Sequence, residues 1–401
     1  MLPQTLYQDP NELAPYYARF RVAERCLLTG HSHQAWPDVG LEGQRQAWLD
    51  AAELVDAKWE RAFDRAERVR QGFRALLDDD ESVGAMALGA NTHELVVRYL
   101  SALPLARRPR IVTTDGEFHS LRRQLDRLAE EGIAVVRVAT APVDTLAGRI
   151  AAAIDDRTAT VMMSAVLFAN ARIVPGIGLV AAECRRRGVP LLVDAYHALN
   201  VVPFPLAAQG LEDTFVVGGG YKYCQLGEGN CFLRFPRDTA LRPVVTGWFA
   251  EFGELAAGPG GDAVAYAAGD GRFAGATYDP TSHYRAAAVF DFFRQRELDP
   301  GLLREVSQHQ VGLLARLFDD LDLDPAAIAR DRTVPLEATG GFLALTSPRA
   351  AALQALLSER GVLTDCRGDV LRLGPAPYLC DNQLADAVEA LRESVASAAP
   401  S

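Results

Sequence analysis

Lys222 is a candidate reactive group because of the residues that precede it. It lies in the run Gly-Gly-Gly-Tyr-Lys-Tyr, residues 218–223, at the end of an apolar segment. Glycines permit a tight turn and a close approach of the backbone to a ligand. A lysine held in a partly desolvated site has a lowered pKa and becomes a nucleophile. Most lysines lie on the surface, but few follow an apolar run and three glycines, so we expect Lys222 to carry chemistry.

A second candidate, Asp194, ends another apolar run, Pro-Leu-Leu-Val-Asp. A carboxylate among buried apolar residues is costly unless it meets a positive charge or strong donors. This acid and Lys222 together predict a site for pyridoxal 5′-phosphate. The lysine would form a Schiff base with the aldehyde, and the acid would keep the pyridine nitrogen protonated so that the ring accepts electrons. Without Lys222, a helix N-cap would explain Asp194 equally well.

The same cofactor needs backbone N–H donors for its phosphate, and the start of a helix provides them. Residues 87–94 supply such a start, with a glycine after a strand and then Asn91 and Thr92 opening a helix. Asn91 followed by Glu94 also fits a capping box, so an ordinary cap without a ligand is the alternative. Tyr221 is placed to donate to the same phosphate.

Aromatic and imidazole rings complete this predicted cofactor site. Phe118 and His119 follow the next strand, and either ring is suited to stack on a heteroaromatic ring. An aromatic residue of the core is the alternative for them. His197 follows Asp194 and is a candidate phosphate ligand, acid/base group or structural histidine.

Two further segments predict contacts to a substrate. Arg372 ends the last predicted strand, where its planar fork suits a substrate carboxylate. The alternative is an ion pair with Asp365 or Asp369. His31 and His33 lie in a polar segment punctuated by Gly and Pro, and contact with a ligand and a simple connecting loop are equally good explanations of them.

The elements that must position these residues read as an α/β fold. Short apolar runs alternate with amphipathic helical patterns, which favours a mostly parallel sheet covered on both faces. The predicted strands are 83–88, 110–114, 134–138, 159–166, 190–193, 215–217 and 231–235. Ligands of such sheets bind beyond the carboxyl ends of the strands, where Asp194 and Lys222 fall.

We expect three regions along the chain. Residues 1–75 look mainly helical and join the small domain, and residues 76–282 form the large cofactor-binding domain. Residues 241–282 look like a loop-dominated bridge within it. Residues 283–401 form a smaller α+β domain, with strands expected at 341–346, 362–364 and 370–373.

Composition restricts the partners of this chain. The 401 residues are 49% hydrophobic, with a formal net charge of −11. An acidic protein of this kind does not suit broad binding to nucleic acid or to an anionic membrane surface. No apolar stretch suggests a membrane span, and no signal peptide is recognisable. The six cysteines have no metal-ligand spacing, so we expect reduced thiols, no metal and a cytoplasmic location.

Taken together, these motifs resemble the pyridoxal-phosphate enzymes of fold type I, a large domain with a mostly parallel sheet plus a smaller α+β domain. The branch is the one that contains class V aminotransferases, cysteine desulfurases and kynureninase, and the resemblance is greatest to kynureninase. It rests on Asp-Ala-Tyr-His at 194–197, Tyr-Lys-Tyr at 221–223, Gly-Trp-Phe at 247–249, and the segments 361–365 and 372–377.

The resemblance implies a role for each matching position. It implies a homodimer with shared active sites, in which Trp248 reaches the phosphate of the neighbouring subunit and Thr277 also contacts the cofactor. Within one subunit it implies these residues: Lys222 as the Schiff-base lysine, Asp194 at the pyridine nitrogen, Phe118 on the ring, Thr92, His197 and Tyr221 on the phosphate side, and Arg372 on the substrate carboxylate.

The substrate half departs from kynureninase. Residues 272–280 replace the Phe-Arg-x-Ser-Asn-Pro-Pro run of that family, Phe168 stands where a tyrosine is expected, and the N-terminal loop differs. We therefore predict kynureninase-like hydrolysis between Cβ and Cγ of an α-amino acid other than kynurenine. Elimination at Cβ, as in a C–S lyase, and transamination are the alternatives.

Two other functions are less favoured by the sequence. A cysteine desulfurase needs a mobile thiol, and Cys366 is the candidate for it by its polar setting, although an incidental cysteine explains it better. A regulatory module that binds the cofactor is a further alternative, and it is disfavoured because no basic helix-turn-helix segment precedes the fold.

Overall fold

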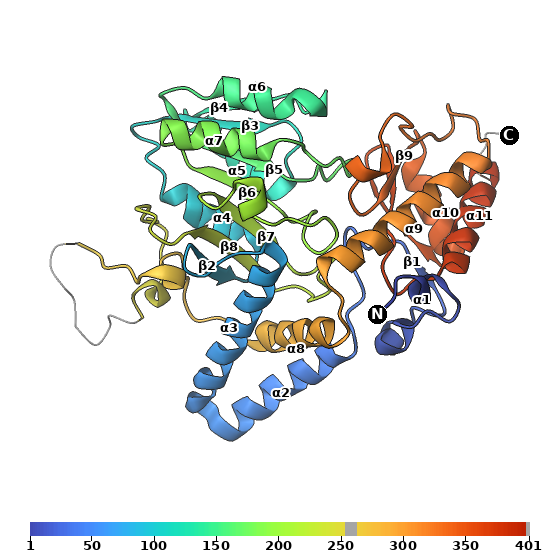
Figure 1. Ribbon diagram of the computed structural model, residues 1–401, viewed down its shortest axis with the longest axis horizontal. Helices are drawn as coiled ribbons and strands as arrows, with labels where there is room; N and C mark the ends of the chain where they lie inside the picture. The colour runs from blue at the N-terminus through green and yellow to red at the C-terminus, as the bar shows by residue number, and fades with distance from the viewer. Residues whose placement is uncertain (253–262, 398–401) are drawn as a thin grey trace.

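The chain folds into a large α/β body and a smaller α+β body that lie side by side (Figure 1). The computed structural model describes residues 1–252 and 263–397. The predicted bridge at 241–282 therefore lies partly outside the described residues, at 253–262.

The large body is built on a seven-stranded sheet with the order β2-β8-β7-β6-β5-β3-β4. Its strands are β2 (Gly84–Gly89), β3 (Arg110–Thr114), β4 (Ala134–Val138), β5 (Thr158–Ser164), β6 (Leu191–Asp194), β7 (Phe215–Gly219) and β8 (Cys231–Pro236). Strands β4, β3, β5, β6 and β7 pair in parallel, which confirms the predicted mostly parallel sheet. Strand β8 runs antiparallel to β7 and β2. The chain returns from β7 to β8 through a short loop, whereas a parallel pair would need a helical crossover.

Helices cover both faces of this sheet. One face carries α4 (Thr92–Ser101) and α5 (His119–Glu130), and the other carries α3 (Lys58–Leu77), α6 (Leu146–Ala153) and α7 (Ile177–Arg187). Successive residues of β5 enter opposite cores, with Val161 and Met163 in one and Met162 in the other. Because both faces are buried, the strands are apolar throughout.

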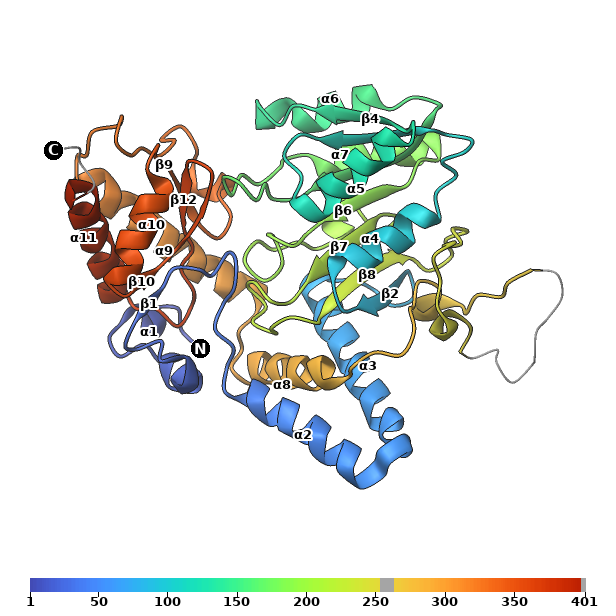
Figure 2. The same ribbon diagram turned by 180° about the vertical axis from the view of Figure 1, so that it is seen from behind.

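The N-terminal region is less uniformly helical than expected. Helix α1 (Gln4–Tyr7) and the 3-10 helix η1 (Ala14–Phe20) precede a short strand, β1 (Cys26–Leu27). Strand β1 pairs in parallel with β10 (Val362–Leu363), so these residues pack with the smaller body. The long helical pattern that follows is split into α2 (Val39–Leu54) and α3 near Val55, whose φ is 51°. Both helices pack on α8 (Thr281–Gln295), as Figure 2 shows from behind.

The smaller body contains an antiparallel sheet with the order β11-β12-β9. Its elements are β9 (Leu343–Thr346), β11 (Asp365–Arg367), β12 (Val370–Leu373), α9 (Pro300–Asp320), α10 (Ala350–Glu359) and α11 (Asp381–Ser397). Of the predicted strands, the one at 362–364 does not join this sheet, because β10 pairs with β1 instead. Strand β11 was not predicted, and its pairing with β12 puts Asp365 opposite Arg372.

Short 3-10 helices occupy other connections: η2 (Val55–Ala57), η3 (Val143–Thr145), η4 (Ala207–Gln209), η5 (Trp248–Glu251), η7 (Gly269–Gly271) and η8 (Leu336–Ala338). In the part of the chain that the structure describes, no helix combines the length and the apolar character needed to cross a membrane.

Candidate active site

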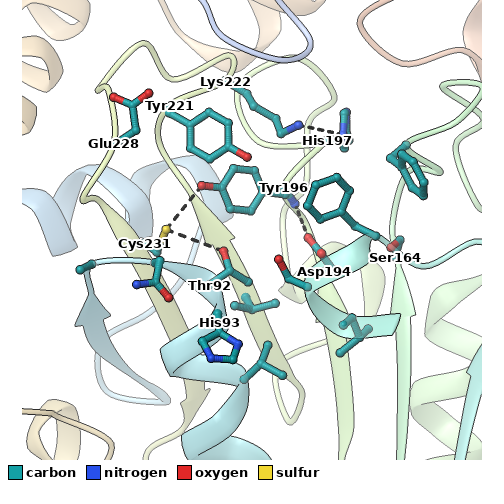
Figure 3. A pocket seen from close by; sticks show the side chains of 18 of the residues that line it. Thr92, His93, Ser164, Asp194, Tyr196, His197, Tyr221, Lys222, Glu228 and Cys231 are labelled. Atoms are coloured by element: carbon teal, nitrogen blue, oxygen red, sulfur yellow. Dashed lines mark hydrogen bonds between the residues drawn. The ribbon is translucent and has the colours of Figure 1, made fainter. Parts of the chain in front are cut away.

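The carboxyl ends of the parallel strands enclose a cavity of about 420 Å³. This is the edge of the sheet at which α/β folds bind ligands. Seven of the residues predicted for the cofactor or for catalysis line the cavity: Asn91, Thr92, Phe118, Asp194, His197, Tyr221 and Lys222. In Figure 3, Lys222 lies above this space and Asp194 lies below it.

Lys222 follows β7, and its side chain is buried. Its Nζ donates to the carbonyl oxygen of His31 at 3.1 Å and lies 3.1 Å from Nε2 of His197. Burial, and then the positive charge of Arg372, lowers the pKa of Lys222 to about 7. A substantial fraction of this amine is therefore neutral near pH 7, as a nucleophile requires.

The glycines before Lys222 allow neighbouring side chains to pack directly against the backbone. A Cβ atom on Gly219 would lie 2.2 Å from Oη of Tyr196, and one on Gly220 would lie 2.5 Å from Cδ1 of Leu226. Both contacts are far shorter than real Cβ contacts, so larger residues would displace the loop that presents Lys222. We expected these glycines to admit a ligand, and the structure shows that they admit neighbouring side chains.

Asp194 is the last residue of β6 and is partly exposed to the cavity. Burial raises the pKa of this carboxyl to about 6, although the backbone N–H of Tyr196 donates to Oδ1 at 2.9 Å and opposes the shift. No hydrogen bond to Oδ2 is found among the described residues. A protonated ring nitrogen would relieve the cost of this buried charge, so the carboxylate fits the predicted cofactor.

His197 lies at the amine end of the cavity. Burial, followed by the charges of Lys222, His31 and Arg372, lowers the pKa of His197 well below its ordinary value, so the imidazole is neutral. Its Nδ1 is buried and has no hydrogen-bond partner among the described residues. Of the roles that the sequence left open, this position favours a polar contact at the reacting end over a contact to the phosphate.

The start of α4 forms the cap that the sequence suggested, and it also lines the cavity. Oδ1 of Asn91 accepts from the backbone N–H of Glu94 at 2.9 Å. The hydroxyl of Thr92 lies 3.7 Å from Sγ of Cys231. The cap is therefore confirmed. Asn91 and Thr92 also line the cavity, and the contact of this helix start with a phosphate stays a prediction.

Phe118 lines the cavity, and its role as the ring-stacking residue stays a prediction. Its ring centroid lies 5.7 Å from Nζ of Lys222 and 5.4 Å from the ring of Phe168, in an edge-on arrangement. His119, the other ring considered, is not among the residues that line the cavity.

The residues predicted to bind substrate lie beyond the residues that line the cavity, on the side of the smaller body, and we call them the second wall of the site. The imidazole of His31 is fully buried, with Nε2 3.5 Å from Oδ2 of Asp365, and only its backbone carbonyl contacts Lys222. His33 is exposed at the cavity mouth, where its ring stacks on Tyr221 at 4.9 Å and Nε2 lies 3.6 Å from Glu228.

Arg372 is engaged within the protein. Its Nη2 pairs with Oδ2 of Asp365, and its Nη1 donates to the carbonyl oxygen of Phe168 at 2.8 Å. The structure thus forms the ion pair that the sequence left as the alternative, and the guanidinium does not line the cavity.

Trp248 and Thr277 lie together outside this cavity. Nε1 of Trp248 donates to Oγ1 of Thr277 at 3.3 Å, and 45% of the tryptophan surface is exposed. Thr277 lines a neighbouring cavity of about 690 Å³, which shares Glu228 and Gly229 with the first. Neither residue contacts the Lys222 cavity of its own chain.

Several residues at the site were missed from the sequence. Cys231, Tyr196 and Ser164 line the cavity, and Glu117 lies buried behind Ser164. Their positions at strand ends were the available signal, since Ser164 ends β5 and Cys231 begins β8. Cys366, the desulfurase candidate, lies in β11, and its thiol donates to Oε1 of Gln354 at 3.0 Å.

Comparison with known proteins places this geometry in context. No protein-family model matches the chain. The chain is 22% identical over 355 residues to an uncharacterized aminotransferase, YcbU, of Bacillus subtilis, covering 86% of this chain and 88% of that protein. It is 25% identical over 258 residues to a kynureninase of Geobacillus thermodenitrificans, covering 62% of this chain and 55% of that protein.

Solved structures resemble the whole chain. A C-DES mutant with glycine covalently linked to the PLP cofactor superposes with a TM-score of 0.80 at 16% identity, covering 94% of this chain and 98% of that one. The cysteine desulfurase CsdA of Escherichia coli superposes with a TM-score of 0.76 at 15% identity, covering 97% and 98%. The chain therefore has the predicted fold, that of the fold type I pyridoxal-phosphate enzymes. The particular likeness to kynureninase is only weakly supported, because that match covers part of each chain.

Proposed function

We propose that this protein is a pyridoxal-phosphate-dependent enzyme that acts on an α-amino acid. The observation that carries the proposal is a buried amine with a pKa of about 7, Lys222, facing the buried carboxylate of Asp194 across one cavity. The relatives support it, because they include a protein named as an aminotransferase and one named as a kynureninase, and a superposed structure carries the PLP cofactor.

The residues of the cavity fit this cofactor at three places. When bound, the cofactor supplies an aldehyde for the lysine and a ring that accepts electrons from the substrate Cα. Asp194 would hold a proton at the ring nitrogen, and Phe118 would stack on the ring. The N–H groups at the start of α4, with Thr92 and Tyr221, would hold the phosphate.

Lys222 then acts as the base at the substrate Cα. About half of its amine is neutral near pH 7, and its Nζ lies 3.1 Å from Nε2 of His197. This contact and the hydrogen bond to the carbonyl oxygen of His31 hold the amine in place beside the cavity. His197 itself stays neutral because its pKa is held low, so it does not compete with Lys222 for the proton from Cα.

For the reaction, we favour elimination at Cβ of the C–S lyase kind. Phe168 lines the cavity at the position where kynureninases carry a tyrosine, so no phenol is available there to a substrate carbonyl. One superposed structure is the cystine C–S lyase C-DES with its product cysteine persulfide, at a TM-score of 0.78 and 17% identity. Kynureninase-like hydrolysis is the second candidate, because a kynureninase is among the relatives.

A desulfurase reaction is less well supported by the geometry. It requires a thiol that reaches the substrate. Cys366 is instead held in the antiparallel pair β11–β12 by a hydrogen bond to Gln354. The cavity thiol of Cys231 is buried, and burial raises its pKa, so it is a poor nucleophile.

The proposal also assigns contacts to the substrate and to the cofactor of a neighbouring subunit. Arg372 would bind the α-carboxylate once its pairing with Asp365 opens or is shared. His33 stands at the mouth, next to Tyr221, where the side chain of a substrate would enter. Trp248 and Thr277 would contact the cofactor of the neighbouring subunit in a homodimer.

A pair of variants tests the cofactor. The chain contains two lysines, Lys58 at the start of α3 and Lys222. The purified protein incubated with pyridoxal phosphate should show a visible absorbance band that Lys222→Ala abolishes and Lys58→Ala keeps. A wild-type protein without the band would refute the proposal.

A substrate screen separates the reactions. Cysteine conjugates, kynurenines and amino-group acceptors are offered to the loaded enzyme, and the release of pyruvate, alanine or a keto acid is measured. Pyruvate from a cysteine conjugate supports elimination. Alanine from a kynurenine, without pyruvate from any conjugate, would replace elimination by hydrolysis.

A further inference from the structure

Glu117 is a buried acid that the proposed chemistry does not use. Only 3% of its surface is exposed, and it joins β3 to α5 directly before Phe118. Its side chain is not part of the cavity lining. Burying a carboxylate costs folding free energy unless charges or hydrogen bonds compensate it.

Hydrogen bonds engage both oxygens of this carboxylate. Oε1 accepts from the hydroxyl of Thr114 at 2.5 Å and from the backbone N–H of Ser164 at 3.2 Å. Oε2 accepts from the hydroxyl of Ser164 at 2.7 Å. The hydroxyl of Thr114 also accepts from the backbone N–H of Gly116 at 3.2 Å, which leaves its proton for Glu117. These hydrogen bonds connect the segment that carries Phe118 to the end of β5.

The same contacts connect Glu117 to the acid of the site. Ser164 lines the cavity, and it pairs with Asp194 in the register of β5 and β6. One residue therefore separates the two buried carboxylates. Burial, and the negative charge of Asp194, raises the pKa of Glu117 to about 7, against the effect of its hydroxyl donors. The other titratable groups that line this cavity include Lys222, His197, Tyr196 and Tyr221, and Asp194 is the one whose charge acts on Glu117.

We propose that Glu117 is a positioning residue of the cofactor site, which acts through Ser164 to hold Phe118 and Asp194 in place and places a second negative charge behind Asp194. This inference rests on the proposed function. A cation at the ring nitrogen would compensate Asp194 and so allow Glu117 to ionise. The two acids together then favour the protonated form of the bound cofactor more than Asp194 alone does.

The test is the pH midpoint of the visible absorbance band in the loaded protein, together with the dissociation constant of the cofactor. Glu117→Gln keeps the shape and an acceptor but removes the charge. Its midpoint should fall by roughly half a pH unit or more, because a negative charge that stabilises the protonated form is lost. The matched control is Glu131→Gln, an exposed glutamate at the end of α5 that lies next to Arg127, whose midpoint should equal that of the wild type.

A second variant keeps the inference testable if Glu117→Gln does not fold. Ser164→Ala keeps the charge but removes the linking hydroxyl, so cofactor binding should weaken about threefold to tenfold, as the net loss of one ordinary hydrogen bond predicts. Unchanged midpoints and dissociation constants in every folded variant, with only a lower melting temperature, would reduce Glu117 to a structural role and overturn the inference. A wild-type protein without the band would instead overturn the proposed function.

Discussion

The two walls of the site, the cavity lining on the large body and the residues behind it on the smaller body, differ in how ready they are for a ligand. On the wall formed by the large body, Lys222, Asp194 and His197 line the cavity and keep polar atoms available to it. On the wall formed by the smaller body, Arg372 and Asp365 are paired with each other. The first wall can therefore bind a cofactor without rearrangement. In the second wall, Arg372 must exchange the carboxylate of Asp365 for that of the substrate. Preorganisation therefore favours cofactor binding first, with substrate binding coupled to a change in the smaller body.

The largest expected effect comes from the wall formed by the large body. Asp194→Asn should lower turnover about a thousandfold, because the amide does not stabilise a protonated ring nitrogen in a buried site. The cofactor should still attach to Lys222. Steady-state kinetics with the best substrate of the screen measures the loss, and turnover within tenfold of the wild type would remove Asp194 from its assigned role.

Arg372 tests the opposite wall. Arg372→Gln should raise KM about thirtyfold, since roughly 2 kcal/mol of charge-assisted hydrogen bonding to the carboxylate is lost. The dissociation constant of the cofactor should not change. If cofactor binding weakens as much as KM rises, then the two walls are not separate in function.

Asp365 would compete with the substrate carboxylate for the guanidinium of Arg372. Asp365→Asn should lower KM roughly fivefold, because a hydrogen bond from Arg372 to a neutral amide is worth about 1 kcal/mol less than one to a carboxylate. Asp369→Asn, in the same hairpin, provides the matched control and should leave KM unchanged. A higher KM in Asp365→Asn would show that this acid orients Arg372 and does not oppose the substrate.

The two walls also communicate through charge at Lys222. In the cofactor-free protein, the rate of reaction with the aldehyde should rise with pH around a midpoint of about 7, because only the neutral amine reacts. Arg372 contributes to that low pKa, so Arg372→Gln should move the midpoint upward by roughly half a pH unit. Stopped-flow absorbance measures both values, and a downward shift would contradict the account.

The smallest effect concerns stability. Burial lowers the pKa of His31 to about 3, below its value of about 6.5 in the unfolded chain. Between these two pH values, the unfolded chain therefore binds more protons than the folded chain. The contribution of His31 is therefore fully present above pH of about 6.5 and is lost as the pH falls toward 3. Chemical denaturation at pH 7 and pH 5 should show a smaller loss in His31→Gln than in the wild type. An equal loss would assign the acid sensitivity to other groups.

The wall formed by the large body could be predicted from the sequence because local patterns define it. Lys222 and Asp194 each follow an apolar strand, and parallel strands bring such ends together. The wall formed by the smaller body could not, because β11 is three residues long and β1 pairs with β10 across more than three hundred residues of chain. The engagement of Arg372 by Asp365 depends on the pairing of β11 with β12, so the sequence left two alternatives open. Glu117 was missed because its partner, Ser164, is distant in the chain.

The most direct test of the central claim is to locate the bond between protein and cofactor. The loaded protein is reduced with borohydride, digested, and its peptides are examined by mass spectrometry. Lys58 and Lys222 are the two lysines of the chain, so they are the two lysine side chains that the cofactor could label. The account predicts label on the peptide that contains Lys222 and none on the peptide that contains Lys58. A loaded protein with label on Lys58 or with no label on Lys222 would contradict it.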